Sequence, residues 1–153
     1  MKHLLIVFHS KTGHTEKLVE AVYRGATSQE ISGIEVRIKQ ASQATDQDLL
    51  WADGAILGTP ENFGYMSGAL KDFFDRTFYE VEGRLSPLPY ALVIGAGNDG
   101  TGAVRSIERI ANGYPLTKVA EPIISRQVPT DAILKQCEEL GGLLAAGLEM
   151  GIF

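Results

Sequence analysis

Hydroxyl-bearing residues gather around a single glycine in residues 10–15, which read Ser-Lys-Thr-Gly-His-Thr. Hydroxyl groups donate hydrogen bonds, and a helix that begins here would add free backbone N–H groups and the positive end of its dipole. Such a segment can bind a phosphate monoester, which needs several donors and only modest positive charge. The alternative is an ordinary helix start, because Ser and Thr are common N-cap residues. A Walker A loop is excluded, since no Gly-Lys-Ser/Thr ends the segment.

A second glycine-rich segment, residues 95–100, fits the pattern G-x-G-x-x-G between an apolar run and an amphipathic stretch. In dinucleotide-binding proteins this fingerprint belongs to the first strand–helix unit, and an acidic residue ends the next strand. Here it follows the fourth expected strand, and Glu121 falls early in or before the strand that comes next. A dinucleotide site is therefore the less favoured interpretation of these glycines.

Apolar runs alternate with amphipathic stretches along the whole chain, and this pattern positions both segments. It predicts strands and helices in strict alternation, one of the helices being short, which makes five strand–helix units in one domain of residues 1–153. Strand–helix alternation indicates a parallel sheet covered by helices on both faces. Ligands bind such sheets beyond the carboxyl ends of the strands. The expected strands cover residues 4–8, 34–38, 55–58, 90–94 and 119–124, and the expected helices cover 14–29, 45–51, 67–78, 104–111 and 131–148.

Two loop motifs carry a resemblance to a known family. Residues 10–15 resemble the phosphate loop of flavodoxins, Thr/Ser-x-Thr-Gly-x-Thr, at its usual place after the first strand. Residues 58–68, Gly-Thr-Pro-Glu-Asn-Phe-Gly-Tyr-Met-Ser-Gly, resemble the second flavin loop of flavodoxin-like NAD(P)H-dependent FMN reductases and of quinone reductases of the tryptophan-repressor-binding type. The resemblance implies a flavodoxin-like α/β fold: a doubly wound, five-stranded parallel sheet in the order 2-1-3-4-5, within three α/β/α layers. It also implies FMN as the cofactor.

The resemblance assigns a part of FMN to each loop. The first loop would hold the phosphate, the second would approach the flavin ring, and the third, residues 95–102, would meet the pyrimidine edge of the ring. Phe63 would supply an aromatic wall, and Glu61 is expected to be a surface carboxylate rather than a general base. The residues expected to bind FMN are Ser10, Lys11, Thr12, Gly13, His14, Thr15, Thr59, Pro60, Glu61, Asn62, Phe63, Gly64, Ala96, Gly97, Asn98, Asp99, Gly100 and Gly102.

Composition excludes several other classes of function. A net charge of -5 argues against a nucleic-acid surface, and no apolar run approaches the roughly 20 residues of a membrane helix. The histidines His3, His9 and His14 show no metal-ligand spacing, so no metal is expected. Cys137 is the only cysteine, which fits a reducing cytoplasm.

Two functions fit these features. The first is an oxidoreductase that uses FMN, takes electrons from NADH or NADPH and passes them to a quinone or free flavin; the flavin carries the chemistry, so no catalytic side chain is expected. It is favoured because no aromatic residue lies between Ile94 and Ile110 to cover the flavin. The alternative is a flavodoxin-type electron carrier that serves redox protein partners. The short chain favours the carrier and the modest charge does not. A flavin-free signalling domain is disfavoured by the two flavin loops.

Overall fold

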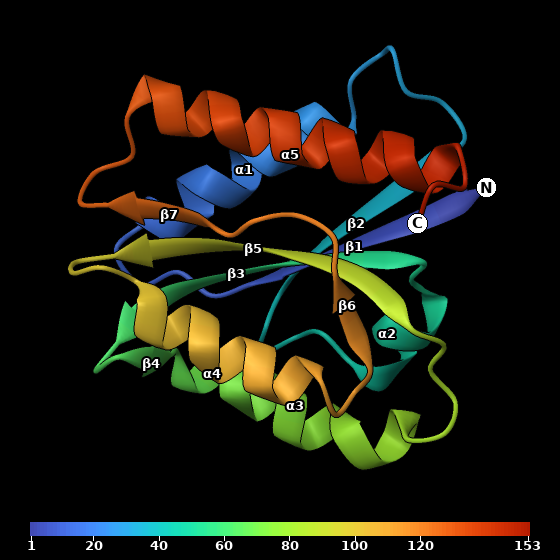
Figure 1. The fold of residues 1–153 in the computed structure, drawn as a ribbon, viewed down its shortest axis with the longest axis horizontal. Helices are drawn as coiled ribbons and strands as arrows, with labels where there is room; N and C mark the ends of the chain where they lie inside the picture. The colour runs from blue at the N-terminus through green and yellow to red at the C-terminus, as the bar shows by residue number, and fades with distance from the viewer.

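Helices lie on both faces of a mainly parallel sheet in the computed structural model, which describes all 153 residues (Figure 1). The strand order is β2-β1-β3-β5-β6, with β7 on the same edge of β5. This is the predicted order 2-1-3-4-5, and the prediction of a doubly wound flavodoxin-like sheet is confirmed. The strands are β1 (Lys2–Phe8), β2 (Ile34–Gln40), β3 (Gly54–Asn62), β4 (Tyr65–Met66), β5 (Leu88–Ala96), β6 (Leu116–Lys118) and β7 (Ile123–Arg126).

The sheet departs from the prediction at its fifth strand and after its third. The strand expected over residues 119–124 is largely wrong: β6 ends at Lys118, β7 begins at Ile123, and the four residues between them stand opposite only residues 91–92 of β5. Pro122 lies in that interruption and has no N–H group for the ladder. β3 runs past its expected end and forms a hairpin with β4, where Asn62 pairs with Tyr65 in antiparallel register.

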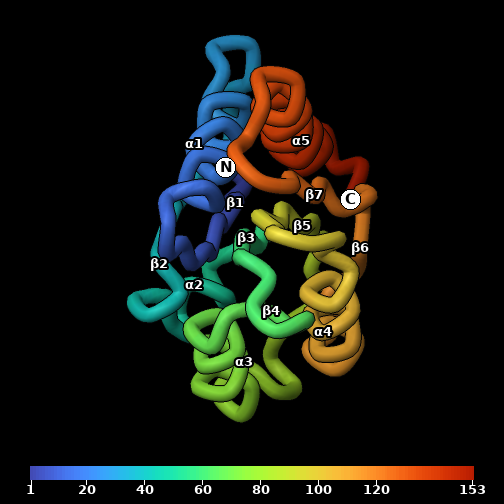
Figure 2. Tube along the Cα trace, turned by 90° about the vertical axis from the view of Figure 1, so that its left-hand side faces the viewer, coloured from blue at the N-terminus to red at the C-terminus, as the bar shows by residue number.

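Alternate side chains of each central strand enter different cores. Leu4 and Ile6 of β1 pack with α1 (His14–Ala26) and α5 (Asp131–Glu149), whereas Leu5 and Val7 face the opposite side. That second core lies under α2 (Asp46–Trp51), α3 (Gly68–Val81) and α4 (Thr101–Ala111) (Figures 1 and 2). The helix expected over residues 14–29 ends at Ala26. None of the helices is both long enough and apolar enough to span a membrane.

Helices α1 and α5 lie side by side with their backbones almost touching (Figure 2). A Cβ atom on Gly25 would lie 1.8 Å from the carbonyl oxygen of Glu138, and one on Gly141 would lie 2.0 Å from that of Val22. Only glycine permits so close an approach. The contact joins α1, near the beginning of the chain, to the last helix, α5.

The short helix α2 is fixed by a buried carboxylate in its first turn. Asp48, whose side chain is only 3% exposed, accepts hydrogen bonds from the Thr45 N–H and from Arg37, both at 2.8 Å, and Lys39 lies 3.6 Å away. Burial acts to raise the pKa of Asp48, but the Thr45 N–H and the two cations outweigh it and leave the pKa lowered. The capping box expected from Thr45 to Asp48 is confirmed.

Candidate functional site

Three loops meet at the carboxyl ends of β1, β3 and β5, the edge at which doubly wound sheets bind ligands. They enclose a cavity of about 280 Å³. Apart from Gly95 and Gln127, every residue of its lining was among the predicted FMN-binding residues. The lining consists of Lys11, Thr12, His14, Thr15, Pro60, Asn62, Gly95, Ala96, Gly97 and Gln127.

The first loop has the geometry of an anion site. The Ser10 hydroxyl accepts the N–H groups of Gly13 (3.1 Å) and Glu16 (3.2 Å), so this side chain shapes the loop and does not line the cavity. Gly13 is the N-cap of α1, with φ 95° and no capping side chain. The N–H groups of the first helical residues, His14 and Thr15, have no partner within the chain. They lie where the helix dipole favours negative charge.

The third loop packs directly against the first. A Cβ atom on Gly95 would lie 2.8 Å from the Thr15 hydroxyl oxygen, so glycine is needed for this approach. A Cβ on Gly97 would meet nothing within 4 Å, which leaves the backbone open toward the cavity. Gly95 is the register partner of Ser125, whose buried hydroxyl has no hydrogen-bond partner.

Gln127, which is not among the predicted site residues, joins the cavity from the far edge of the sheet. Its N–H donates to the Ala96 carbonyl (3.1 Å) and its side-chain amide donates to that of Gly97 (3.4 Å). Its φ of 64° is unusual for a residue other than glycine. No motif marks Gln127; only its place after the strand beside β5 could have indicated it.

The second loop is the turn of the β3–β4 hairpin. Phe63 and Gly64 form its two-residue tip, with φ of 52° and 69°. Positive φ at both tip positions is typical of a type I′ turn, which normally carries Asn-Gly. The Phe63 side chain is fully exposed and lies outside the cavity lining, so in this structure it does not form the expected wall. Thr59 is fully buried, and its hydroxyl accepts the Ser67 N–H at 3.0 Å.

Glu61 connects the second loop to the third. One carboxylate oxygen accepts the Gly100 N–H (3.3 Å), and the other accepts the N–H groups of Gly102 (3.0 Å) and Ala103 (3.3 Å). A Cβ atom on Gly102 would lie 2.1 Å from the Gly64 carbonyl oxygen, so the hairpin rests on the first turn of α4. These side chains and glycines fix the relation between two cavity walls and are not part of its lining.

Asp99 and Asn98 form the exposed rim of the third loop. The Asp99 carboxylate accepts the N–H (2.9 Å) and the hydroxyl (2.8 Å) of Thr101, and these hydrogen bonds lower the pKa of Asp99. Asp99 therefore stays ionised and closes the turn that leads into α4. Neither rim residue lines the cavity.

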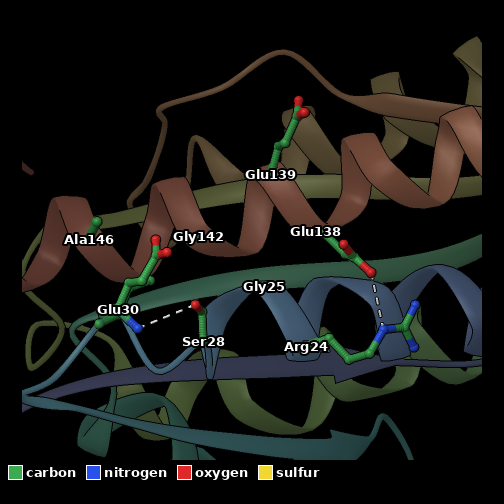
Figure 3. Close-up of a pocket in the computed structure, with 9 residues that line it drawn as sticks. Arg24, Gly25, Ser28, Glu30, Glu138, Glu139, Gly142 and Ala146 are labelled. Carbon is green, nitrogen blue, oxygen red and sulfur yellow. Dashed lines mark hydrogen bonds and ion pairs between the residues drawn. The ribbon is translucent and has the colours of Figure 1, made fainter.

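A larger cavity, of about 580 Å³, lies far from these loops in the groove between α1 and α5 (Figure 3). The Arg24 side chain reaches Glu138 across this groove at 3.2 Å, while Glu30 and Glu139 add further negative charge. The groove lies away from the carboxyl ends of the strands, and it carries one cation for three carboxylates. We therefore assign the candidate site to the smaller cavity, where unpaired backbone donors and glycine walls converge.

These features fit FMN. Thr12 and the free N–H groups at the start of α1 suit a singly attached phosphate, because they supply donors without concentrated positive charge. The glycines of the third loop leave backbone groups free to meet a polar ring edge, and Pro60 with Asn62 forms the opposite wall.

Known proteins resemble this chain in sequence and in fold. Residues 1–120 match the NADPH-dependent FMN reductase family. A flavodoxin of Aquifex aeolicus is 41% identical over 85 residues, which cover 56% of this chain and 45% of that protein. An NAD(P)H dehydrogenase (quinone) of Acidithiobacillus ferrooxidans is 35% identical over an alignment of 97 positions, covering 50% of this chain and 48% of the other. The alignments thus span about half the length of these curated relatives.

Solved structures share the fold over nearly the whole chain. A flavodoxin from the domain Archaea superposes with a TM-score of 0.81 at 21% identity, covering 96% of this chain and 99% of the other. A WrbA-like flavodoxin from Agrobacterium tumefaciens gives 0.78 at 18% identity, covering 98% and 99%. The match of residues 1–120, together with the fold and the two loop motifs, places this chain in the NADPH-dependent FMN reductase family, as a flavodoxin-like, FMN-binding redox protein.

Proposed function

We propose that this chain is an NAD(P)H-linked, FMN-dependent oxidoreductase whose acceptor is a quinone or free flavin. The observation that carries the proposal is the wall that the third loop gives to the cavity, which consists of Gly95, Ala96 and Gly97. Residues this small leave one face of a flavin open, so a nicotinamide or quinone ring can stack on it. The relative named as an NAD(P)H dehydrogenase (quinone) supports the same assignment.

Bound FMN would accept electrons from the nicotinamide and pass them to the acceptor, while the protein binds and orients it. Thr12, Thr15 and the first N–H groups of α1 would bind its phosphate. Pro60 and Asn62 line one wall of the cavity and would lie beside the ring, and the backbone of residues 96–97 would meet its polar edge. No side chain is assigned a proton transfer, in keeping with chemistry supplied by the cofactor.

The deciding experiment is anaerobic reduction of the FMN-loaded protein by NADH or NADPH, followed through the visible absorbance of the flavin. Rapid bleaching, and recovery on addition of a quinone or free flavin, is the expected result. A protein that binds FMN but shows no turnover with either nucleotide across these acceptors is an electron carrier, and the proposal is then wrong. The relative named as a flavodoxin makes the carrier the direct alternative.

The phosphate assignment has its own test in the double variant Thr12→Ala, Thr15→Ala. Each charge-assisted hydrogen bond contributes about 1.5–3 kcal/mol, so FMN affinity should fall at least tenfold while riboflavin affinity stays the same. Thr117→Ala, an exposed threonine on β6, is the matched control and should leave both affinities unchanged. Equal binding of FMN and riboflavin by the original protein would show that the first loop holds no phosphate.

The open face can be tested by adding the missing aromatic ring. Asn98 lies exposed on the rim of the third loop, so in Asn98→Tyr the new ring can reach over the flavin. Aromatic stacking adds about 0.5–1.5 kcal/mol beyond area burial, so FMN should bind more tightly and nucleotide oxidation should slow. Faster oxidation would contradict an access route over this rim.

Small-molecule donors and acceptors are the partners we propose, in a cytoplasmic setting. The single cysteine, Cys137, is buried, and burial raises the pKa of its thiol to about 12. It therefore remains a protonated, inert thiol and does not take part in electron transfer.

A further inference from the structure

We propose that Glu61 is a positioning residue that locks the second and third cofactor loops together through the first turn of α4. The inference builds on the proposed function, because those two loops form opposite walls of the FMN cavity. Glu61 is not itself a lining residue, although its neighbours Pro60 and Asn62 are, so its effect on the cofactor passes through the backbone that it holds.

The loop that leads into α4 caps only one helical N–H group, that of Thr101, through Asp99, so the other N–H groups of the helix start take acceptors from the neighbouring loop. The N-cap of α4 is Gly100, in the left-handed region with φ 76°, and it has no capping side chain. The carboxylate of Glu61 supplies acceptors to three N–H groups of this helix start, from residues 39 to 42 positions farther along the chain. A carboxylate at a helix N-terminus also interacts favourably with the helix dipole. No ion pair joins Glu61 to a cation, so the helix start is its counter-charge.

Two further contacts place Glu61 at the centre of a joint between the loops. On one side, the Gly64 carbonyl rests against Gly102 so closely that no other residue fits there. On the other, the Met66 N–H donates to the buried Ser106 hydroxyl of α4 at 3.1 Å. The hairpin is thus docked on α4 through one charged contact and two neutral ones.

The joint sets the distance between the walls of the cavity. Asn62, next to Glu61, lines one wall, and Gly97, three residues before the N-cap of α4, lines the other. In a dinucleotide-binding unit, the N-terminus of the helix that follows the glycine-rich loop faces the pyrophosphate of the ligand. In this protein the Glu61 carboxylate occupies the corresponding place, at the N-terminus of α4. The G-x-G-x-x-G pattern of residues 95–100 therefore serves loop packing, with Glu61 in place of an external anion.

Amide exchange in the cofactor-free protein tests the lock directly. Glu61→Gln keeps the shape of the side chain but turns one acceptor into a donor that faces the N–H groups of α4. The amides of Gly100, Gly102 and Ala103 should exchange at least tenfold faster than in the original protein. Glu108→Gln removes an equal charge from the same helix, at an ion pair with Lys118, and should leave these amides unchanged.

Flavin titration then separates positioning from a contribution to stability alone. At a temperature where circular dichroism shows every variant folded, Glu61→Gln should weaken FMN and riboflavin by a similar factor, about tenfold, because the ring loops are shared. The first-loop double variant should weaken FMN alone. Glu61→Ala, which removes the acceptors without adding a donor, should also weaken both.

Flavin affinity and amide exchange each test a different part of the inference. Unchanged affinity for both flavins in Glu61→Gln would overturn the inference even if the melting temperature fell, since Glu61 would then be only structural. Unchanged exchange of the three amides would overturn it as well. If the original protein binds no FMN, the proposed function fails instead, and amide exchange still decides whether the lock exists.

Discussion

Asp48 and Glu61 both use a carboxylate to satisfy backbone N–H groups at the start of a helix, Asp48 for α2 and Glu61 for α4. Asp48 lies within the helix that it caps, is almost fully buried, and is balanced by Arg37 and Lys39. Glu61 belongs to another element, is partly exposed, and has no cation beside it. Both carboxylates have hydrogen-bond partners. Asp48 has a backbone N–H group and two cations beside it, whereas Glu61 has backbone N–H groups alone.

The difference separates a contact that stabilises the fold from one that assembles a site. The bonds of Asp48 close a local turn and tie it to the neighbouring strand, at a distance from every cavity-lining residue. The bonds of Glu61 join two loops of the cavity and supply the only charged contact between them. We expect changes at Asp48 to alter the free energy of unfolding and changes around Glu61 to alter flavin affinity.

The largest effect is expected for Asp48→Asn. The substitution leaves Arg37 and Lys39 without their buried partner, and breaking such a pair costs several kcal/mol when both ions are buried. Because the cations here are about one-third exposed, a loss of about 2 kcal/mol in the free energy of unfolding is expected. Chemical denaturation measures this value. A loss of flavin affinity in the folded variant would contradict the expectation that Asp48 contributes to stability alone.

Gly102→Ala should affect the site more than the fold. The new Cβ would overlap the Gly64 carbonyl oxygen, so the hairpin must move away from α4. Overpacking of this kind costs about 1–3 kcal/mol, and we expect FMN affinity to fall about tenfold or more. Titration of the apoprotein measures it. Gly68→Ala, where a Cβ meets nothing within 4 Å, is the matched control and should bind FMN normally.

Part of the Asp48 contribution should appear as a dependence of stability on pH. The pKa of Asp48 is lowered in the folded protein, so its stabilisation is complete above the ordinary aspartate pKa of 3.8 and is lost as the pH falls through the lower folded value. Unfolding measured across acidic pH should show a steeper loss in the original protein than in Asp48→Asn. Parallel pH profiles would contradict a lowered pKa at this carboxyl.

The smallest effect is expected at the tip of the hairpin. Phe63 has φ 52° and a fully exposed ring, so its left-handed backbone is not offset by packing. Asn tolerates this region better, and Phe63→Asn should stabilise the cofactor-free protein by less than about 1 kcal/mol. Phe63→Ala keeps the backbone cost and should bring no gain in thermal unfolding. Destabilisation by Asn would indicate that the ring packs in solution.

The elements that local patterns determine were predictable. Alternating apolar runs placed the main strands, and Thr45 with Asp48 marked the start of α2 because both halves of that cap lie within four residues. The hydroxyl-rich segment of residues 10–15 was expected at the start of a helix and lies there, against the cavity.

Features that depend on distant contacts were not predictable. Glu61 looked like a surface carboxylate, because its partners lie in a different loop. Gln127 reaches the cavity because it follows β7, which pairs with the end of β5 and so places the Gln127 backbone beside Ala96. The orientation of Phe63 follows from the hairpin with β4, and a strand of only two residues leaves no periodic signal.

The contact between α1 and α5 has a consequence for the order in which the protein is made. Gly25 meets Glu138 and Val22 meets Gly141, so one layer of the molecule joins segments more than 110 residues apart. A ribosome releases α1 long before α5, and until then the apolar side of α1 lacks its partner. The layer under α3 and α4 has no buried residue beyond Leu116 and can therefore form before α5 is made. Newly synthesised chains should therefore depend most on chaperones before the last helix emerges.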